Sequence, residues 1–308
     1  MPAVPRTTRH TFLEGPLVRI GDLTVRPAND AIGPVEHEDQ FLLVLPTSGV
    51  FALHDSPNRR RVVTANHAVL VPANAPYRIS FPAAIGDHAL TLRLSAEALE
   101  AGLPSRHAPR GVARSLLGLR MLLPPSVMLA RHLFWRRLAL HQVDALGAEE
   151  FGMRLFDLVL QSSDAACARR RGTPRGAARQ RQIERVKEAV AVSPDRKWSL
   201  HLLAELACTS PYHLARVFRE STGTSIHQYL LRLRLALALR RLLASEADLA
   251  TIASDLGFSS HSHFSARFRA LFGTTPTEIR RNGGGDLDRL HALLAWSGPS
   301  TMPAPCAR

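Results

Sequence analysis

Short apolar segments separated by turn residues fill the first third of the chain. Residues 41–45 and 69–71 are continuous apolar runs, and each is followed at once by a proline. Residues 78–81 and 90–94 instead alternate apolar and polar positions, which is the period of a strand with one wetted face. Several short strands at this spacing predict a small sandwich or barrel between residues 15 and 95.

The pattern becomes helical from residue 95 onward. Residues 126–142 and 148–161 have helical composition, and the second segment places Phe151, Leu155 and Leu158 on one stripe. The first part of the chain therefore reads as strands followed by helices.

A change of composition separates this first part from the rest. Residues 168–180 are rich in Arg, Gly and Ala and contain Pro174 and Gly176. We interpret residues 166–180 as a linker and solvated hinge, although its arginines could also touch phosphate.

Beyond the linker the chain reads as helices joined by short turns. A glycine run then opens a flexible tail, residues 283–308, in which residues 287–296 suit one short helix. The expected organisation is a first domain over residues 1–165 and an all-α domain over residues 181–282. The fold class is therefore α+β with two domains.

The helical domain contains a repeat with a period of about fifty residues. Residues 203–225 and 252–276 share a small alanine in a first helix, a tight turn four residues later, and a serine where a second helix starts. Each copy then has a large apolar residue four positions before a phenylalanine, an arginine after that phenylalanine, and a Gly-Thr pair five residues beyond it. Such a repeat indicates a duplicated supersecondary unit.

The small residues of each copy have a structural reason. Ala204 and Ala253 are expected where the first helix approaches the second, because a larger side chain would separate the two helices. Gly257 supplies the backbone freedom that the turn requires. Cys208 occupies the same place in the first copy, where we expect it to pack as a small apolar residue.

The second helix of each copy is predicted to be capped and amphipathic. Ser210 and Ser260 are good N-caps. The core stripes are Leu214, Val217 and Phe218 in the first copy, and Phe264 and Phe268 in the second. The faces left outward carry Tyr212, Ala215, Arg216 and Arg219 in the first copy, and Ser262, His263, Ser265, Ala266 and Arg269 in the second.

This arrangement is a helix-turn-helix, whose second helix enters the major groove of duplex DNA. Arginine can pair with guanine or with phosphate, and serine and histidine can reach either. Residues 226–243 predict one long apolar and basic helix between the copies. That helix would hold the two reading helices about 34 Å apart, near one turn of DNA.

The duplicated unit resembles the DNA-binding domain of the AraC/XylS family of transcription regulators. The resemblance covers residues 180–281 and includes the closing segment 273–280. It implies base-contact positions at Tyr212 and Arg216 in the first unit, and at Ser262, His263 and Ala266 in the second. The family often has an arginine where this chain has Ala266, and Arg267 is displaced by one. The second unit is therefore expected to read bases less and to contact phosphate more.

The predicted DNA-binding residues are the helix starts and the outward polar side chains: Ser210, Tyr212, Arg216, Arg219, Ser260, His261, Ser262, His263 and Arg269. Alternatives remain open for some of them. Tyr212 could pack on a neighbouring helix, and Arg219 and Arg269 suit phosphate as well as bases. His213 is interpreted as a packed residue near the core.

The distribution of charge supports a polyanionic partner. The formal net charge is +13, and residues 1–165 carry 17 Lys/Arg against 15 Asp/Glu, whereas residues 166–308 carry 22 against 11. A strongly basic half attracts nucleic acid through counterion release, independently of base sequence.

Other compositional features place the protein in the cytoplasm. No apolar segment is long enough for a membrane helix, and the amino terminus lacks the apolar core of a signal peptide. The three cysteines lie far apart, so we expect neither a disulfide framework nor a zinc cluster, in a reducing compartment.

The family resemblance implies a cupin-like barrel followed by dimerisation helices in the first domain, and residues 65–77 look like a degenerate second cupin motif. Catalytic cupins bind metal through a His-x-His pair, a glutamate and a later histidine. Here His37 is followed by Glu38 and Asp39, and Tyr77 stands where the later histidine would be. We therefore expect no metal site and no cofactor.

Three functional interpretations follow. The first is a regulator that binds promoter DNA and responds to a small-molecule effector, with His37, Glu38 and His54 either lining a ligand pocket or lying on plain surface. The second is a cupin-type metalloenzyme with a DNA-binding appendage, which the missing ligands disfavour. The third is a DNA-repair methyl acceptor, which would need a metal-bound cysteine cluster. We favour the first, with no enzymatic activity.

The expected partners are double-stranded promoter DNA, a small-molecule effector and a second copy of the chain, with RNA polymerase as a candidate protein partner and no membrane. Residues 126–161 are the candidate dimer surface. Binding could activate or repress transcription, with activation as the working assignment.

Overall fold

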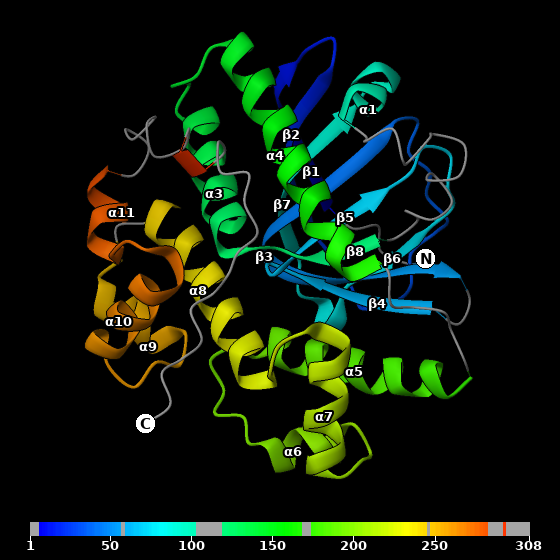
Figure 1. The fold of residues 1–308 in the computed structure, drawn as a ribbon, viewed down its shortest axis with the longest axis vertical. Coiled ribbons are helices and arrows are strands. Elements are labelled where there is room, and N and C mark those ends of the chain that lie inside the picture. Colours follow the sequence, from blue (N-terminus) through cyan, green and yellow to red (C-terminus); the bar gives the residue numbers. More distant parts are fainter. Residues whose placement is uncertain are drawn as a thin grey trace.

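The computed structural model describes residues 6–56, 59–102, 119–167, 174–244, 247–282 and 292–293 (Figure 1). The first part of the chain is rich in strands: β1 (Arg6–Glu14), β2 (Val18–Arg26), β3 (Phe41–Ser56), β4 (Arg59–Thr64), β5 (His67–Val71), β6 (Arg78–Ser80), β7 (Asp87–Leu94) and β8 (Leu119–Leu122). The short 3-10 helix η1 (Pro82–Ala84) precedes β7, and the helices α1 (Ala96–Gly102), α3 (Pro125–Ala139) and α4 (Ala145–Cys167) follow it.

The second part is helical throughout. Its helices are α5 (Pro174–Val192), α6 (Leu200–Leu206), α7 (Pro211–Thr222), α8 (Ile226–Ala244), α9 (Leu249–Asp255), α10 (His261–Phe272) and α11 (Pro276–Asn282). The predicted α+β division into a sheet-rich and a helical part is therefore confirmed. The exact domain boundaries remain a prediction, and the tail helix expected at residues 287–296 lies outside the described residues except for Ala292 and Leu293.

The sheet is open rather than closed into a barrel. Its strand order is β1-β2-β7-β3-β5-β8, and β4 and β6 pair with β3 off this path. Within the described ranges no pairing joins the outer strands β1 and β8. The predicted cupin-like barrel is therefore not confirmed, although the predicted strands at residues 41–45, 69–71, 78–81 and 90–94 all fall in strands of this sheet.

The long strand β3 belongs to two layers of strands. Its first half pairs with β5 and β7, and its second half pairs with β4 and β6. The change of partner follows a register shift between Pro46 and Ser48. Gly49, at a φ of 79°, comes next, and a side chain there would collide with the backbone of Gly86. The bend explains why the run 41–45 ends at a proline.

Both faces of the sheet are buried, which accounts for the continuous apolar runs. Leu43, Leu45 and Leu90 belong to the core that α3 and α4 share with the sheet. Leu42 and Val44, on the opposite face, belong to a second apolar cluster. The period of two therefore sends alternate side chains to two different environments.

Most of helix α3 is buried by contacts within the same chain. Its buried residues include Leu129, Phe134 and Arg131, whose guanidinium donates to the carbonyl oxygens of Pro46 and Ala65 at 2.5 and 3.2 Å. Burial lowers the pKa of Arg131 to about 9. The apolar side chains of α3 that were expected at a dimer interface thus pack within the chain instead.

Helix α4 turns a polar face outward, with Glu150, Arg154 and Gln161 exposed. Its apolar stripe, with Phe151 and Leu155, is buried as predicted but against the sheet and α3. The role of residues 126–161 as dimerisation helices is not confirmed.

Part of the predicted hinge is helical. Helix α5 begins at Pro174, a residue that suits the first position of a helix, so residues 174–180 form its first turns. Farther along α5, Ile183, Val186 and Val190 are buried, and the helix packs on β4 and β3. Tertiary packing has therefore made part of a segment with loop-like composition into a helix.

Candidate nucleic-acid interface and the cavity of the first domain

The first helix-turn-helix consists of α6 and α7. The Ser210 side chain accepts a hydrogen bond from the backbone N–H of His213 at 3.3 Å and so caps α7, as predicted. Cys208 lies in the turn at a φ of 51° and is exposed. The expectation that Cys208 packs in the core is wrong, because this position carries the left-handed backbone that closes the turn.

The second unit, α9 and α10, repeats this geometry. Ser260 caps α10 by accepting from the backbone N–H of His263 at 3.1 Å. Gly257, in the place of Cys208, has a φ of 73°, and a side chain there would collide with the carbonyl of Asp195. The predicted need for glycine at this turn is confirmed.

The buried stripes are those that the repeat predicted. Leu214, Val217 and Phe218 are fully buried beneath α7, as are Phe264 and Phe268 beneath α10. Ala204 and Ala253 are each 1% exposed. The remaining faces of both second helices are therefore free to meet a partner.

The outward face of α7 combines an aromatic with two arginines. Tyr212 is 81% exposed, so it does not pack on a neighbouring helix. Arg216 pairs with Glu220 at 3.0 Å, and its other terminal nitrogen lies 3.4 Å from Nδ1 of His213. Arg219 is exposed, whereas His213 is half-buried against Arg216 rather than inside the core.

The outward face of α10 is also polar, and Ala266 stands where the first unit has Arg216. His261, Ser262, His263, Ala266 and Arg269 are all exposed. Arg267, one position beyond Ala266, is also exposed and donates to Nε2 of His263 at 3.3 Å. All the predicted DNA-binding residues are thus at the surface, and their contacts with DNA remain a prediction.

Two arginines of α8, Arg232 and Arg234, bond the protein's own backbone, a role that the sequence pattern did not reveal. Arg234 donates to the carbonyl oxygens of Pro194, Arg196 and Gly257 at 2.6, 3.0 and 2.9 Å. The Arg232 guanidinium bonds the carbonyl of Leu123. Helix α8 therefore ties the turn of the second unit to the end of α5 and to the first domain.

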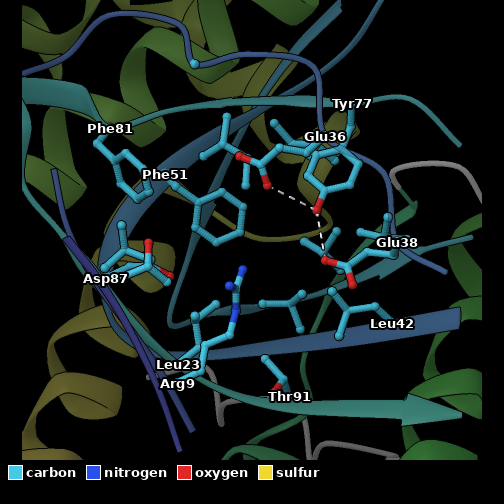
Figure 2. A pocket seen from close by; sticks show the side chains of 18 of the residues that line it. Arg9, Leu23, Glu36, Glu38, Leu42, Phe51, Tyr77, Phe81, Asp87 and Thr91 are labelled. Carbon is cyan, nitrogen blue, oxygen red and sulfur yellow. Dashed lines mark hydrogen bonds between the residues drawn. The ribbon is translucent and has the colours of Figure 1, made fainter. Parts of the chain in front are cut away.

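A cavity of about 690 Å³ lies in the first domain, on the face of the sheet opposite α3 and α4 (Figure 2). Its apolar wall includes Leu42, Val44, Phe51, Leu53, Val71 and Phe81. Strand β7 contributes Asp87, Thr91 and Arg93. This volume is in the range of small-molecule sites.

One end of the cavity carries a hydrogen-bonded acidic group. The Tyr77 hydroxyl lies 3.0 Å from Glu38 and 3.4 Å from Glu36, and Arg93 pairs with Glu38 at 3.1 Å (Figure 2). Burial raises the pKa of Glu36, and burial together with the two carboxylates raises the pKa of Tyr77. Arg9 projects into the cavity from β1.

Asp87 lies apart from this group, in the part of Figure 2 that also shows Phe51 and Phe81. Asp87 is 6% exposed, and burial raises the pKa of its carboxyl to about 7. Such a perturbed carboxyl in a cavity is typical of binding and catalytic sites.

Of the three predicted ligand residues, the structure places only Glu38 in the cavity wall. His37 is exposed, and His54 bonds Ser80 Oγ at 2.9 Å; neither lines the cavity. Sequence reasoning missed Asp87 and Glu36. The alternation of β7 could have pointed to Asp87, which shares a face with Thr91 and Arg93.

Two polar clusters connect the first domain to the helical part. In one, Arg120 on β8 holds Glu184 on α5 with two hydrogen bonds of 2.6 and 2.9 Å. Glu184 also accepts from the backbone N–H of Val62 at 2.6 Å. Burial alone would raise the pKa of Glu184, but the charges of Arg120 and Lys187 bring it to about 2.

In the other cluster, Arg240 on α8 donates to Nδ1 of His88 at 2.5 Å. The opposite nitrogen of His88 lies 2.7 Å from the carboxylate of Asp22, which also accepts from the Trp135 indole at 2.9 Å. His88 directly follows Asp87 on β7. The imidazole of His88 therefore connects the strand that lines the cavity to Arg240 on α8.

Among the described residues, no group of three or more His, Cys, Asp or Glu side chains is placed to hold a metal ion. Likewise, no described helix is both long and apolar enough to cross a membrane.

The chain matches two domain families. A model described as a helix-turn-helix domain matches residues 203–282, and one described as an AraC-binding-like domain matches residues 7–123.

Relatives carry the same type of domain. The chain is 36% identical over 141 residues to the HTH-type transcriptional regulator GlxA of Rhizobium meliloti, covering 44% of this chain and 43% of that protein. It is 43% identical over 67 residues to the HTH-type transcriptional activator RhaS of Pectobacterium carotovorum, covering 22% and 24%. The matched part spans less than half the length of these curated relatives.

A solved structure of an AraC-type regulator from Chromobacterium violaceum is similar at 29% identity and a TM-score of 0.33, covering 34% of this chain and 95% of that one. The two domain matches, together with relatives that are regulators with the same helix-turn-helix, support an AraC family transcriptional regulator.

Proposed function

We propose that this protein regulates transcription by inserting α7 and α10 into the major groove of promoter DNA. The observation that carries the proposal is the pair of outward helix faces. Both helices are capped by a serine, rest on a buried apolar stripe and present polar side chains to solvent. The basic second half of the chain adds a general attraction to phosphate.

The two helices have unequal roles in this proposal. Tyr212, Arg216 and Arg219 give α7 the side chains that discriminate bases. Helix α10 exposes Ala266 at the centre of its face, and its arginines suit phosphate. We therefore assign base reading mainly to α7 and anchoring mainly to α10.

Selection from a random pool of duplex oligonucleotides with the full chain tests this function. The expected result is an enriched sequence with one strongly specified half-site and a second, weaker one about 10 base pairs away. Affinity should fall steeply between about 50 and 200 mM salt. Equal affinity for the selected and the starting pool would remove the proposal.

We also propose that the cavity of the first domain holds a small-molecule effector. Its volume, its apolar wall and its buried carboxyls support a ligand site. The contact from β7 through His88 to Arg240 offers a route by which a ligand alters the position of α8. An effector acts in this way only by binding one arrangement of the domains more tightly than another.

Two copies are proposed to bind DNA together, with RNA polymerase as the machinery whose access to the promoter they alter. Sedimentation at micromolar concentration, with and without the selected DNA, tests the assembly. A monomer in both conditions would exclude the homodimer without affecting the DNA-binding proposal.

A further inference from the structure

Asp87 is a cavity carboxyl that no other side chain neutralises. In the part of the chain that the structure describes, no other side chain forms a hydrogen bond or ion pair with its carboxylate, and its own backbone N–H is the one group that lowers its pKa. Glu38, by contrast, is held by Arg93 and by the Tyr77 hydroxyl. The two carboxyls share one cavity, but only one of them has its partner supplied by the protein.

The fold keeps Asp87 in this position. In the sheet it lies between Val25 on β2 and Gly49 on β3, and the alternation of β7 turns its side chain to the cavity face. An aspartate that is 6% exposed loses most of its hydration, which destabilises its charged form. A cationic ligand would restore the lost interaction.

The surroundings of Asp87 favour an organic cation. Phe51 and Phe81 line the same cavity, and in Figure 2 both rings appear in the part of the view that also shows Asp87. Aromatic rings attract an ammonium group through their negative faces, and this attraction strengthens when water is excluded. The site therefore combines an acidic group with two rings, as ammonium-binding sites do.

The rest of the cavity selects an apolar body. Leu42, Val44 and Leu53 line it from β3, and Val71 from β5. A ligand made only of polar groups would leave these side chains without contacts.

We propose that the effector is an amine whose ammonium group pairs with Asp87 beside Phe51 and Phe81 and whose apolar body lies along β3. This inference rests on the proposed sensing role of the cavity.

Arg9 suggests a carboxylate ligand as the competing class. Burial raises the pKa of Glu36, however, and the charge of Arg9 offsets part of that rise, so Arg9 already interacts with an acid inside the cavity. A carboxylate ligand would bring a further negative charge into a space that also holds Glu38 and Asp87. The amine adds the charge that the cavity lacks.

The test is calorimetric titration of the full chain at pH 8 with matched ligands. The probes are hexylamine and 4-phenylbutylamine, each compared with the alcohol and the carboxylate of the same skeleton. We expect at least one amine to bind with a Kd between about 1 µM and 1 mM, roughly ten-fold or more tighter than its alcohol. The matching carboxylate should bind more weakly still.

Asp87→Asn should abolish this ten-fold preference for the amine and leave the alcohol's affinity unchanged. Asp39→Asn, an exposed carboxyl outside the cavity wall, is the matched control and should retain the preference. Thermal melts of both variants establish that they fold.

Tighter binding of a carboxylate, an unchanged preference in Asp87→Asn, or no binding of any amine would each overturn the inference. The sensing role fails separately if neither amine, alcohol nor carboxylate binds. The DNA-binding role is measured by the oligonucleotide selection and is independent of all three results.

Discussion

Arg216 is the side chain on which the proposed reading of DNA depends most. It is exposed on α7, one turn beyond Tyr212, and its pairing with Glu220 holds the guanidinium on the outward face. An exposed pair of this kind contributes little to stability, so the arginine can exchange its carboxylate for a base edge or a phosphate. The repeat identified this residue because its role depends on helical spacing alone.

Arg216→Ala should weaken binding to the selected DNA by about 1–3 kcal/mol, since one good arginine–base contact is worth that much. Titration of labelled duplex measures the loss. Arg26→Ala, an exposed arginine at the end of β2, is the control and should leave affinity unchanged. Equal affinities for all three proteins would remove Arg216 from the interface.

Asp87→Asn should stabilise the free protein at high pH. Because the pKa of Asp87 is raised from 3.8 to about 7, the folded state binds a proton that the unfolded state has released between these values. Stability is therefore lost as pH rises from about 4 to 7, by up to about 4 kcal/mol. The asparagine variant lacks this loss, so its Tm should match the native Tm near pH 4 and exceed it at pH 8. A difference in Tm that does not change with pH would contradict the burial of a titrating carboxyl.

At the scale of elements, the two helix-turn-helix units are the part that sequence alone could predict well. Caps, turns and stripes act over about one helical turn, so they appear as fixed spacings. The bounds of α8 were also predictable, within a residue or two. The turn at Cys208 was predicted too, but the exposure of its side chain was not, because a small side chain packs as readily in a core as it lies at the surface.

Exchanging the residues at the two equivalent turn positions, Cys208 and Gly257, tests whether a positive φ is what each turn requires. Cys208→Gly should be neutral or should stabilise by up to about 1 kcal/mol, because glycine adopts the positive φ without strain. Gly257→Cys should destabilise the protein by more than about 1 kcal/mol, because a side chain at this positive φ adds backbone strain and collides with the Asp195 carbonyl. Urea unfolding monitors both. A destabilised Cys208→Gly would show that the cysteine side chain itself matters.

For the whole molecule, α5 and α8 join the two parts through buried contacts. Leu235 and Leu239 of α8 belong to the same core as the sheet, and Glu184 of α5 pairs with Arg120 on β8. The effector proposed for the first domain would thus act on helices that are packed against that domain rather than on domains joined by a flexible hinge.

Glu184→Gln should destabilise the protein by about 3–5 kcal/mol at neutral pH, because the buried guanidinium of Arg120 loses its carboxylate. The pKa of Glu184 is lowered to about 2, so its contribution is present above pH 4.5 and is lost as pH falls toward 2. The difference between variant and native protein should shrink over that range. Glu188→Gln, whose pair with Arg60 is partly exposed, should change stability by less than about 1 kcal/mol.

The helix-turn-helix units, their resemblance to a known family and the order of strands before helices could all be predicted from the amino-acid sequence, because each unit and each element follows from a pattern within about twenty residues. Four features became evident only in the folded chain: the sheet is open, part of the predicted hinge is helix, α3 is buried by intramolecular contacts, and Asp87 faces a cavity. These features arise between residues far apart in the chain. Their energies depend on which surfaces meet, and no local pattern records that.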